Sequence, residues 1–343
     1  MTSSPSQASS AANHAARSST PRLSRPPPNS VTRYHGPVQE SLTDIASRLS
    51  RRLAPLRGRG RVALRLQQKN PARAATWTIP MRRGHRMVVP STSGQSWRAA
   101  FTGSYDDEVI ELLVPYIKPE SFVLDVGASL GFYTVPLGLA ANRVNARVIA
   151  IEPVKGNCEI LRRNIELNQL EDVVSVVRCA LGTNNAQLTI HVETGGAGNA
   201  TIVSGLECSA VDRHDRAGNT WATETVGVVP LDELELPADI DDLPCSLIKA
   251  DVEGFEMSIL AGGGSFIRKY QPAIFAEFNP AWLKTRGFPA SAPATWAASN
   301  GYTCQELTCS RPNPASDRLT ASFTSLSASG SRSGSDLMMF PRS

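Results

Sequence analysis

The segment 122–134, FVLDVGASLGFYT, constrains the fold more than any other part of the chain. A short, mostly apolar stretch is followed by a turn with glycines at positions 127 and 131, and then by the start of an apolar helix. Glycines let the backbone approach a ligand closely, and a helix N-terminus presents unpaired N–H groups. The segment therefore predicts a strand, a turn and a helix that together face a bound ligand.

The same alternation of short apolar strands and helices continues along the chain. Further strands are predicted at 147–152, 173–180, 247–251 and 273–277, and helices at 106–117, 132–141, 156–168 and 255–260. Buried strands that alternate with helices indicate a parallel sheet covered on both faces. We expect 302–307 and 336–340 to close the sheet as an antiparallel pair, with the Ser-rich stretch between them as a loop. The predicted fold class is α/β, with a doubly wound, mostly parallel, seven-stranded sheet.

One long connection, residues 183–244, interrupts this pattern. It contains alternating apolar residues at Leu188, Ile190 and Val192, and it is longer than connections in compact domains usually are. We therefore predict an inserted β-rich hairpin or lid. The domain itself is predicted to cover 105–343, with a lead-in segment at 71–104.

The first part of the chain has a different composition. Residues 1–100 contain 17 Lys and Arg against two acidic residues, whereas the remainder contains 18 basic and 29 acidic residues. A Ser-, Pro- and Arg-rich segment buries too little apolar surface to fold, so residues 1–70 are predicted to be a disordered basic arm. Without an apolar signal-peptide region we expect a cytoplasmic protein. The Arg-rich, Ser-rich start is also typical of an organelle transit peptide, and that alternative stays open.

Within this arm, residues 41–57 carry apolar residues at near-helical spacing with arginines between them. The pattern predicts an amphipathic helix. Such a helix makes peripheral contact with an anionic membrane, lies on a partner or packs on the protein's own body, and the sequence leaves these alternatives open. No stretch approaches the ~18 apolar residues that a transmembrane helix needs, so none is predicted.

Other classes of site also place a glycine turn between a strand and a helix. A dinucleotide fingerprint needs a second glycine where Ser129 stands, and a pyrophosphate disfavours the adjacent Asp125. The turn also matches G-x-S-x-G, the nucleophile elbow of α/β-hydrolases, with Ser129 as nucleophile. That mechanism requires a histidine late in the chain, and none follows His214. The hydrolase is kept only as an alternative.

Glu152 favours a nucleoside ligand instead. It closes the strand after the turn, where an acid can accept hydrogen bonds from both ribose hydroxyls. With these segments placed, the chain resembles the FkbM-type methyltransferase family. The matching segments are DVGASLGFYT (125–134), VIAIEPVKGNCEILRRNIELN (148–168), CALG (179–182), LDEL (231–234), LIKADVEGFEMSILAGG (247–263) and AIFAEF (273–278).

The resemblance implies a class I methyltransferase fold with S-adenosylmethionine (SAM) as cofactor. It also implies, most often, O-methylation of a hydroxyl on a small molecule, lipid or glycan. By position, it assigns the methionine end of SAM to Asp125, Gly127, Ala128 and Gly131, the ribose to Glu152 with Pro153 and Asn157 beside it, and the adenine border to Cys179 and Ala180.

The end of the strand 247–251 supplies the candidate catalytic residues, because ligands of open α/β sheets lie at the carboxyl ends of strands. We interpret Asp251 as the group that orients or deprotonates the acceptor hydroxyl, and Glu253 as a second candidate base. Lys249 would keep both ionised. The structural alternative is that Lys249 pairs with Glu253 or Glu277 and that the glutamates cap the next helix. No metal site is predicted.

The predicted partner is the methyl acceptor. The basic arm raises the question of nucleic acid, but DVEG (251–254) stands where base methyltransferases usually carry a [DN]-P-P-[YFW] turn. The acidic body also repels phosphates, so nucleic acid is not expected. A non-catalytic module that binds SAM as a structural ligand is the remaining alternative.

Overall fold

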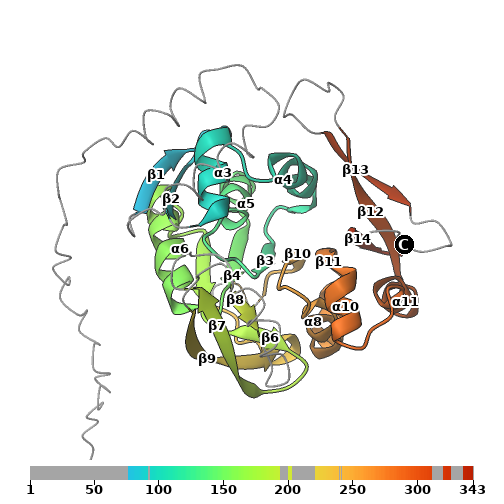
Figure 1. The fold of residues 1–343 in the computed structure, drawn as a ribbon. Helices are drawn as coiled ribbons and strands as arrows, with labels where there is room; N and C mark the ends of the chain where they lie inside the picture. The colour runs from blue at the N-terminus through green and yellow to red at the C-terminus, as the bar shows by residue number, and fades with distance from the viewer. Residues whose placement is uncertain are drawn as a thin grey trace, which may run out of the picture. The chain divides into compact units, whose positions relative to one another are not determined.

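The computed structural model describes residues 76–91, 93–193, 200–202, 221–238, 240, 242–310, 320–325 and 335–342. The arm predicted at 1–70 and the helix predicted at 41–57 lie outside these residues. Within them, a twisted sheet lies between layers of helices (Figure 1).

The central sheet has eight strands in the described part of the chain, in the order β13-β12-β14-β11-β10-β3-β4-β5. Their bounds are β3 Phe122–Val126, β4 Arg147–Ile151, β5 Val174–Val177, β10 Cys245–Ala250, β11 Ala273–Phe278, β12 Tyr302–Ser310, β13 Thr320–Ser325 and β14 Ser335–Pro341. The strands from β11 to β5 run parallel, and β14 runs antiparallel to β11 and β12. The predicted doubly wound, mostly parallel α/β fold is confirmed, including its antiparallel closure.

Two details of the predicted strands are wrong. The Ser-rich stretch expected as a loop contains β13, which adds an eighth strand beyond β12. As an edge strand it needs few apolar residues, and Phe323 alone packs against the core. The third strand, expected at 173–180, ends at Val177, and Ala180–Gly182 forms β6 in a second sheet. The break lies at Arg178, whose guanidinium pairs with Glu224 of that second sheet at 2.6 Å.

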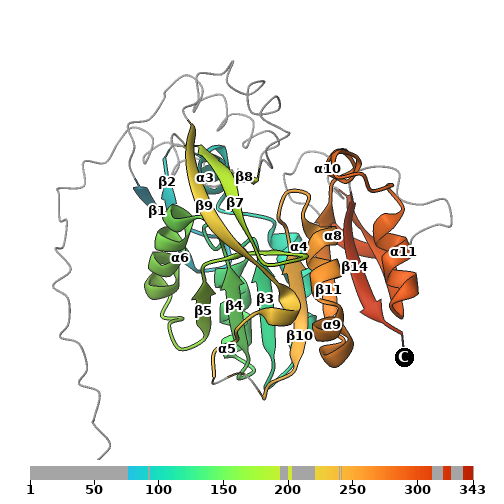
Figure 2. The same cartoon turned by 90° about the horizontal axis from the view of Figure 1, so that it is seen from below.

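Helices cover both faces of the central sheet (Figure 2). Side chains of β3 alternate between the two layers, with Val123 in one core cluster and Leu124 in the other. The first face carries α3 Gly94–Thr102, α4 Asp107–Leu113, α5 Thr134–Asn142 and α6 Lys155–Leu167; the second carries α8 Glu256–Gly262, α9 Gly264–Tyr270, α10 Pro280–Thr285 and α11 Ala292–Ser299. None of the helices in the described residues is both long enough and apolar enough to span a membrane.

The connection expected to be β-rich forms most of the second sheet, whose order is β6-β9-β7-β8 within the described residues. The strands β7 Ala186–Glu193 and β9 Trp221–Pro230 pair antiparallel along β7, and β8 Ala200–Ile202 flanks β7. Buried side chains of this sheet pack around Val154, the residue before α6. The insertion therefore covers the start of α6, close to the ends of β4 and β5.

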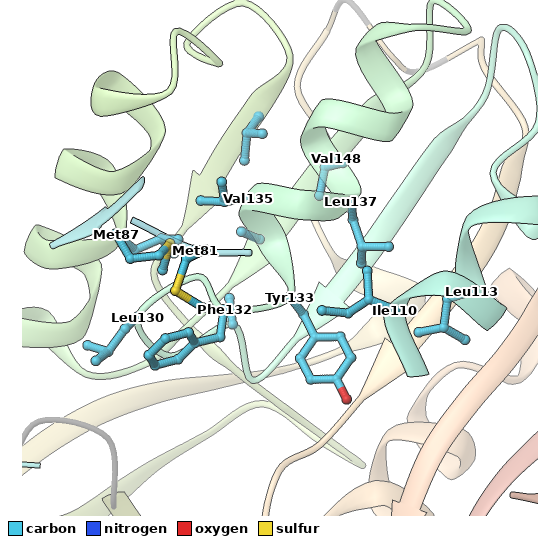
Figure 3. Close-up of a cluster of buried hydrophobic side chains, with 14 of the residues drawn as sticks. Met81, Met87, Ile110, Leu113, Leu130, Phe132, Tyr133, Val135, Leu137 and Val148 are labelled. Atoms are coloured by element: carbon cyan, nitrogen blue, oxygen red, sulfur yellow. The ribbon is translucent and has the colours of Figure 1, made fainter. Parts of the chain in front are cut away.

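The lead-in segment folds as a hairpin, β1 Thr76–Pro80 and β2 Arg86–Pro90, followed by α3. Figure 3 shows Met81 and Met87 of this segment close to Phe132, in the hydrophobic cluster that packs under α5. Trp97 of α3 is 1% exposed, and its indole N–H donates to the carbonyl of Ser91 at 2.6 Å. The lead-in segment thus shares the core of the domain that was expected to begin at residue 105.

Replacing Trp97 tests this shared core. Its ring contacts Trp77 edge-on and stacks on Phe101. Trp97→Ala should lower the free energy of unfolding by about 3–5 kcal/mol, measured by urea denaturation, because it leaves a large cavity. Thr78→Ala, at an exposed position of β1, is the control and should stay within about 0.5 kcal/mol of wild type. A Trp97→Ala variant as stable as the control would show that the lead-in segment does not contribute to the core.

Candidate functional site

A pocket lies at the carboxyl ends of β3, β4 and β10. Ten of the predicted site residues line it: Gly127, Ala128, Glu152, Pro153, Asn157, Cys179, Ala180, Lys249, Asp251 and Glu253. The other two, Asp125 and Gly131, are buried and are not among its lining residues. The sheet therefore brings the predicted cofactor residues and the predicted catalytic residues to one site.

Backbone contact joins the glycine turn to the end of β10. Gly127 has φ 76°, and a Cβ atom at this position would lie 2.0 Å from the carbonyl oxygen of Asp251. The Asp251 N–H in turn donates to the carbonyl of Val126 at 3.1 Å. Only glycine fits here, because a side chain would meet backbone that cannot move aside. The turn and Asp251 are thus held at a fixed separation.

Glu152 organises the wall on the β4 side. One carboxylate oxygen accepts from the Val154 N–H at 3.0 Å and from the Asn157 amide at 3.1 Å. The other accepts from the Ser129 N–H at 2.8 Å, which ties the acid to the glycine turn. Burial raises the pKa of Glu152, while these donors and Lys249 act against the rise. The second oxygen keeps capacity for a further donor, such as a ligand hydroxyl.

Beneath the turn, Lys249 forms an ion pair with Asp125, with 3.0 Å between Nζ and Oδ1. Lys249 also donates to the Gly127 carbonyl at 3.2 Å, and its Nζ lies 5.0 Å from the centre of the Tyr133 ring. Burial alone would lower the pKa of Lys249, but the charges of Asp125 and Asp251 outweigh it and raise that pKa. The charged form of Lys249 is therefore favoured. Its partner is Asp125, and the expected pairing with Glu253 or Glu277 is not found.

Asp125 supports the site from behind. Its second oxygen accepts from the Thr134 hydroxyl at 2.6 Å, so the carboxylate links β3 to the first residue of α5. Asp125 is 0% exposed, so its charge interacts with Lys249 and Thr134 and not with solvent. Gly131 also lies behind the wall, where a Cβ atom would come within 2.7 Å of Leu161.

Aromatic side chains that the sequence analysis did not single out form another wall of the pocket. Tyr105, Phe132 and Tyr133 all line it. The rings of Tyr105 and Phe132 stack at 4.2 Å, and Tyr133 meets Tyr105 edge-on at 6.2 Å. The Tyr133 hydroxyl donates to Asp106 at 3.3 Å. Phe132 and Tyr133 directly follow the glycine turn. Their position in the sequence is the one feature from which their place at the pocket could have been predicted.

Two further carboxylates, Glu277 and Asp336, interact with Asp251 although they are not among the residues that line the pocket. Burial, together with the charges of Asp251 and Asp336, raises the pKa of Glu277 to about 8. Burial and the same Asp251 charge raise the pKa of Asp336 to about 6. The register explains the grouping, because Glu277 of β11 stands opposite Asp336 of β14. Asp336 was not among the predicted site residues, because the sequence does not show that its strand pairs with β11.

Glu256 shapes the loop that presents Asp251 and Glu253. One of its oxygens accepts from the Val252 N–H at 3.0 Å and from the Gly254 N–H at 3.2 Å. Glu253, between them, has φ 53°, and its side chain is exposed at the pocket. Glu256 therefore holds the loop before α8. The helix cap that the structural alternative expected of the glutamates is not formed, because α8 has no side-chain hydrogen bond at its N-cap.

The hydrolase alternative lacks the histidine that its mechanism requires in this pocket. Ser129 has the positive φ, 49°, that a nucleophile elbow requires, but its buried hydroxyl has no hydrogen-bond partner. No histidine is among the residues that line the pocket, and His214 lies outside the described residues. In the described part of the chain, no group of three or more His, Cys, Asp or Glu side chains has the arrangement of a metal site.

Comparison with known proteins gives the family. The family model of the methyltransferase FkbM domain matches residues 125–302, just over half of the chain. The chain belongs to the FkbM methyltransferase family. The matched region runs from Asp125 to Tyr302 and so contains all twelve predicted site residues. The hairpin and α3 precede it.

The individual proteins that resemble this chain share low sequence identity with it. The chain is similar to Methyltransferase 1 of Beauveria bassiana (strain ARSEF 2860), 28% identical over 151 residues that cover 42% of this chain and 58% of that protein. It is also similar to Methyltransferase sdnD of Sordaria araneosa, 28% identical over 201 residues that cover 51% of this chain and 77% of that protein. A crystal structure of Methyltransferase FkbM from Methylobacillus flagellatus KT is 16% identical with a TM-score of 0.35, covering 82% of this chain and 59% of that one.

The carboxylates of this FkbM-family site should make stability depend on pH. The pKa of Glu277 is raised from 4.5 to about 8, so the folded protein retains a proton that the unfolded chain loses. The resulting stabilisation is complete below pH 4.5 and is lost as the pH rises through about 8. Glu277→Gln should therefore raise the melting temperature at pH 9 by roughly 1–3 °C, since solvent screens part of the repulsion, and have little effect at pH 4.

Thermal denaturation followed by circular dichroism at both pH values measures this effect. Glu171→Gln, at an exposed position after α6, is the control and should change neither melting temperature. Equal shifts for Glu277→Gln at pH 4 and pH 9 would show that Glu277 is not coupled to the other carboxylates.

Proposed function

We propose that the protein transfers a methyl group from SAM to a hydroxyl of a small molecule, lipid or glycan. The observation that carries this proposal is the arrangement of Glu152 and Asp251 on either side of the glycine turn, in one pocket. Membership of the FkbM methyltransferase family supports it.

The residues of the pocket fit SAM. Glu152 retains acceptor capacity for ribose hydroxyls, and the half-buried Cys179 with Ala180 and Leu181 offers an apolar surface to a purine ring. Gly127 and Ala128 leave the backbone open beside them, and the unpartnered hydroxyl of Ser129 is available to a polar ligand. When bound, SAM would supply an electrophilic methyl group on a positively charged sulfur.

Asp251 is the residue we assign to the acceptor. It follows β10, lines the pocket and is held against the glycine turn by backbone contact. An acceptor hydroxyl is a weak nucleophile, so a carboxylate that accepts its proton or orients it speeds the transfer.

The other residues align and shield the reacting groups. Tyr105, Phe132 and Tyr133 form an aromatic wall that excludes water from one side of the pocket. Glu256 fixes the loop around Asp251 through two backbone N–H groups. Methyl transfer depends strongly on alignment, so this rigid frame is where much of the rate acceleration would originate. Glu253 remains a second candidate for the proton acceptor.

Cofactor binding is the first test. The purified protein should bind SAM and S-adenosylhomocysteine (SAH) in isothermal titration calorimetry. Glu152→Ala should weaken SAH binding by ~1.5–3 kcal/mol, the value of charge-assisted hydrogen bonds, because the ribose loses its acceptor. Glu159→Ala, on the exposed face of α6, is the matched control and should bind like wild type. A folded wild-type protein that binds neither compound would rule out the proposed function.

The role of Asp251 is tested by Asp251→Asn, which keeps the shape and removes the charge. Turnover should fall by ~10²–10⁴-fold with SAH affinity nearly unchanged, because the residue acts on the acceptor. The acceptor is first identified by mass spectrometry, as the host compound that loses one methyl group when the gene is removed. If the variant loses SAH affinity and retains turnover at saturation, Asp251 belongs to the cofactor site instead.

A further inference from the structure

Asn164 of α6 and Asn168, which caps the C-terminus of that helix, hold the hairpin of β1 and β2 by pairing with it as a β-strand would. Asn164 donates to the Val88 carbonyl at 3.0 Å and accepts from the Val88 N–H. One turn later, Asn168 donates to the Arg86 carbonyl at 2.7 Å and accepts from the Arg86 N–H at 3.0 Å. Each side-chain amide therefore pairs with both backbone groups of one β2 residue, as a neighbouring strand would.

Asn164 differs from Asn168 in one further contact. Its amide also donates to the Leu130 carbonyl at 2.8 Å, inside the glycine turn of the pocket. Asn164 is 0% exposed, so this bond is shielded from water. The extra donor of Asn168 goes to the carbonyl of Asn164 in the same helix. One buried side chain thus connects the hairpin to the turn, and its neighbour four residues later does not.

The hairpin also delivers a side chain to the pocket. Three residues after β2, α3 begins, and Gln95 in its first turn is one of the residues that line the pocket. Its amide carries both donors and acceptors, which suits a ligand with hydroxyl, amine and carboxylate groups. Asn164 links the hairpin to the glycine turn, and α3 follows the hairpin, so Gln95 belongs to the segment that this link holds in place.

We propose that α3, which follows the hairpin of β1 and β2, forms a further wall of the cofactor pocket, in which Gln95 contacts the methyl donor. In this proposal Asn164 is a positioning residue that keeps the wall against the glycine turn. The proposal rests on the proposed function. It extends the cofactor site to residues that precede the region matched by the family model.

Calorimetric titration of the full chain with SAH tests the proposal, at a temperature where melting curves show every variant folded. Asn164→Ala and Asn168→Ala remove equivalent bonds to β2, but only the first frees the Leu130 carbonyl. We expect Asn168→Ala to bind within about twofold of wild type, and Asn164→Ala to bind at least about fivefold more weakly, the effect of losing one buried hydrogen bond.

Gln95→Ala provides a second readout that does not depend on the packing of α6. Its melting temperature should match wild type, because Gln95 is only half-buried, whereas its SAH affinity should fall by about fivefold. Unchanged affinity in Gln95→Ala would overturn the contact with the donor. Equal affinities of Asn164→Ala and Asn168→Ala would overturn the positioning role. If the folded wild-type protein does not bind SAH, both the proposed function and this inference are wrong.

Discussion

The buried ion pair between Lys249 and Asp125 is the interaction on which the pocket depends. The two side chains are 3% and 0% exposed, and β10 and β3 place them opposite each other in the sheet register. Removing one partner of such a pair leaves an uncompensated buried charge, which typically costs about 3–5 kcal/mol. Each partner also makes a hydrogen bond that a hydrophobic residue could not make. Lys249 donates to the Gly127 carbonyl, and Asp125 accepts from the Thr134 hydroxyl.

The charged residues of the site therefore fall into two groups, one that supports the pocket and one that is available to a ligand. Asp125 and Lys249 satisfy each other and form the floor, whereas Glu152 and Asp251 remain at the pocket with capacity for other partners. A sequence shows four ionisable residues at strand ends, but it does not show which of them neutralise each other. Neighbouring strands decide that, and β3 and β10 are separated by more than a hundred residues in the chain.

The parts of the molecule that local pattern determines were predictable. The strand and turn at 122–131 follow from apolar residues and two glycines, and the predicted strands β3, β4, β10 and β11 lie within one or two residues of their observed bounds. The parts set by long-range pairing were not. The edge strand β13 has a loop-like composition, β6 separates from β5 and pairs with β9 in the second sheet, and Asp336 reaches Glu277 only through the register of β14. The buried contacts of Asn164 could not be predicted, because a polar residue in a helix is usually exposed to solvent.

The asparagine pairing on β2 also affects how the protein behaves toward other copies of itself. A two-stranded hairpin has free edges, and exposed edges of this kind recruit strands from other molecules and start aggregation. Asn164 and Asn168 occupy the outward-facing backbone groups of Val88 and Arg86, so this edge of β2 is no longer available as a template at those residues. The asparagines thereby protect this edge of the hairpin from intermolecular pairing without a third strand, and loss of either one would leave the backbone groups of one β2 residue unpaired.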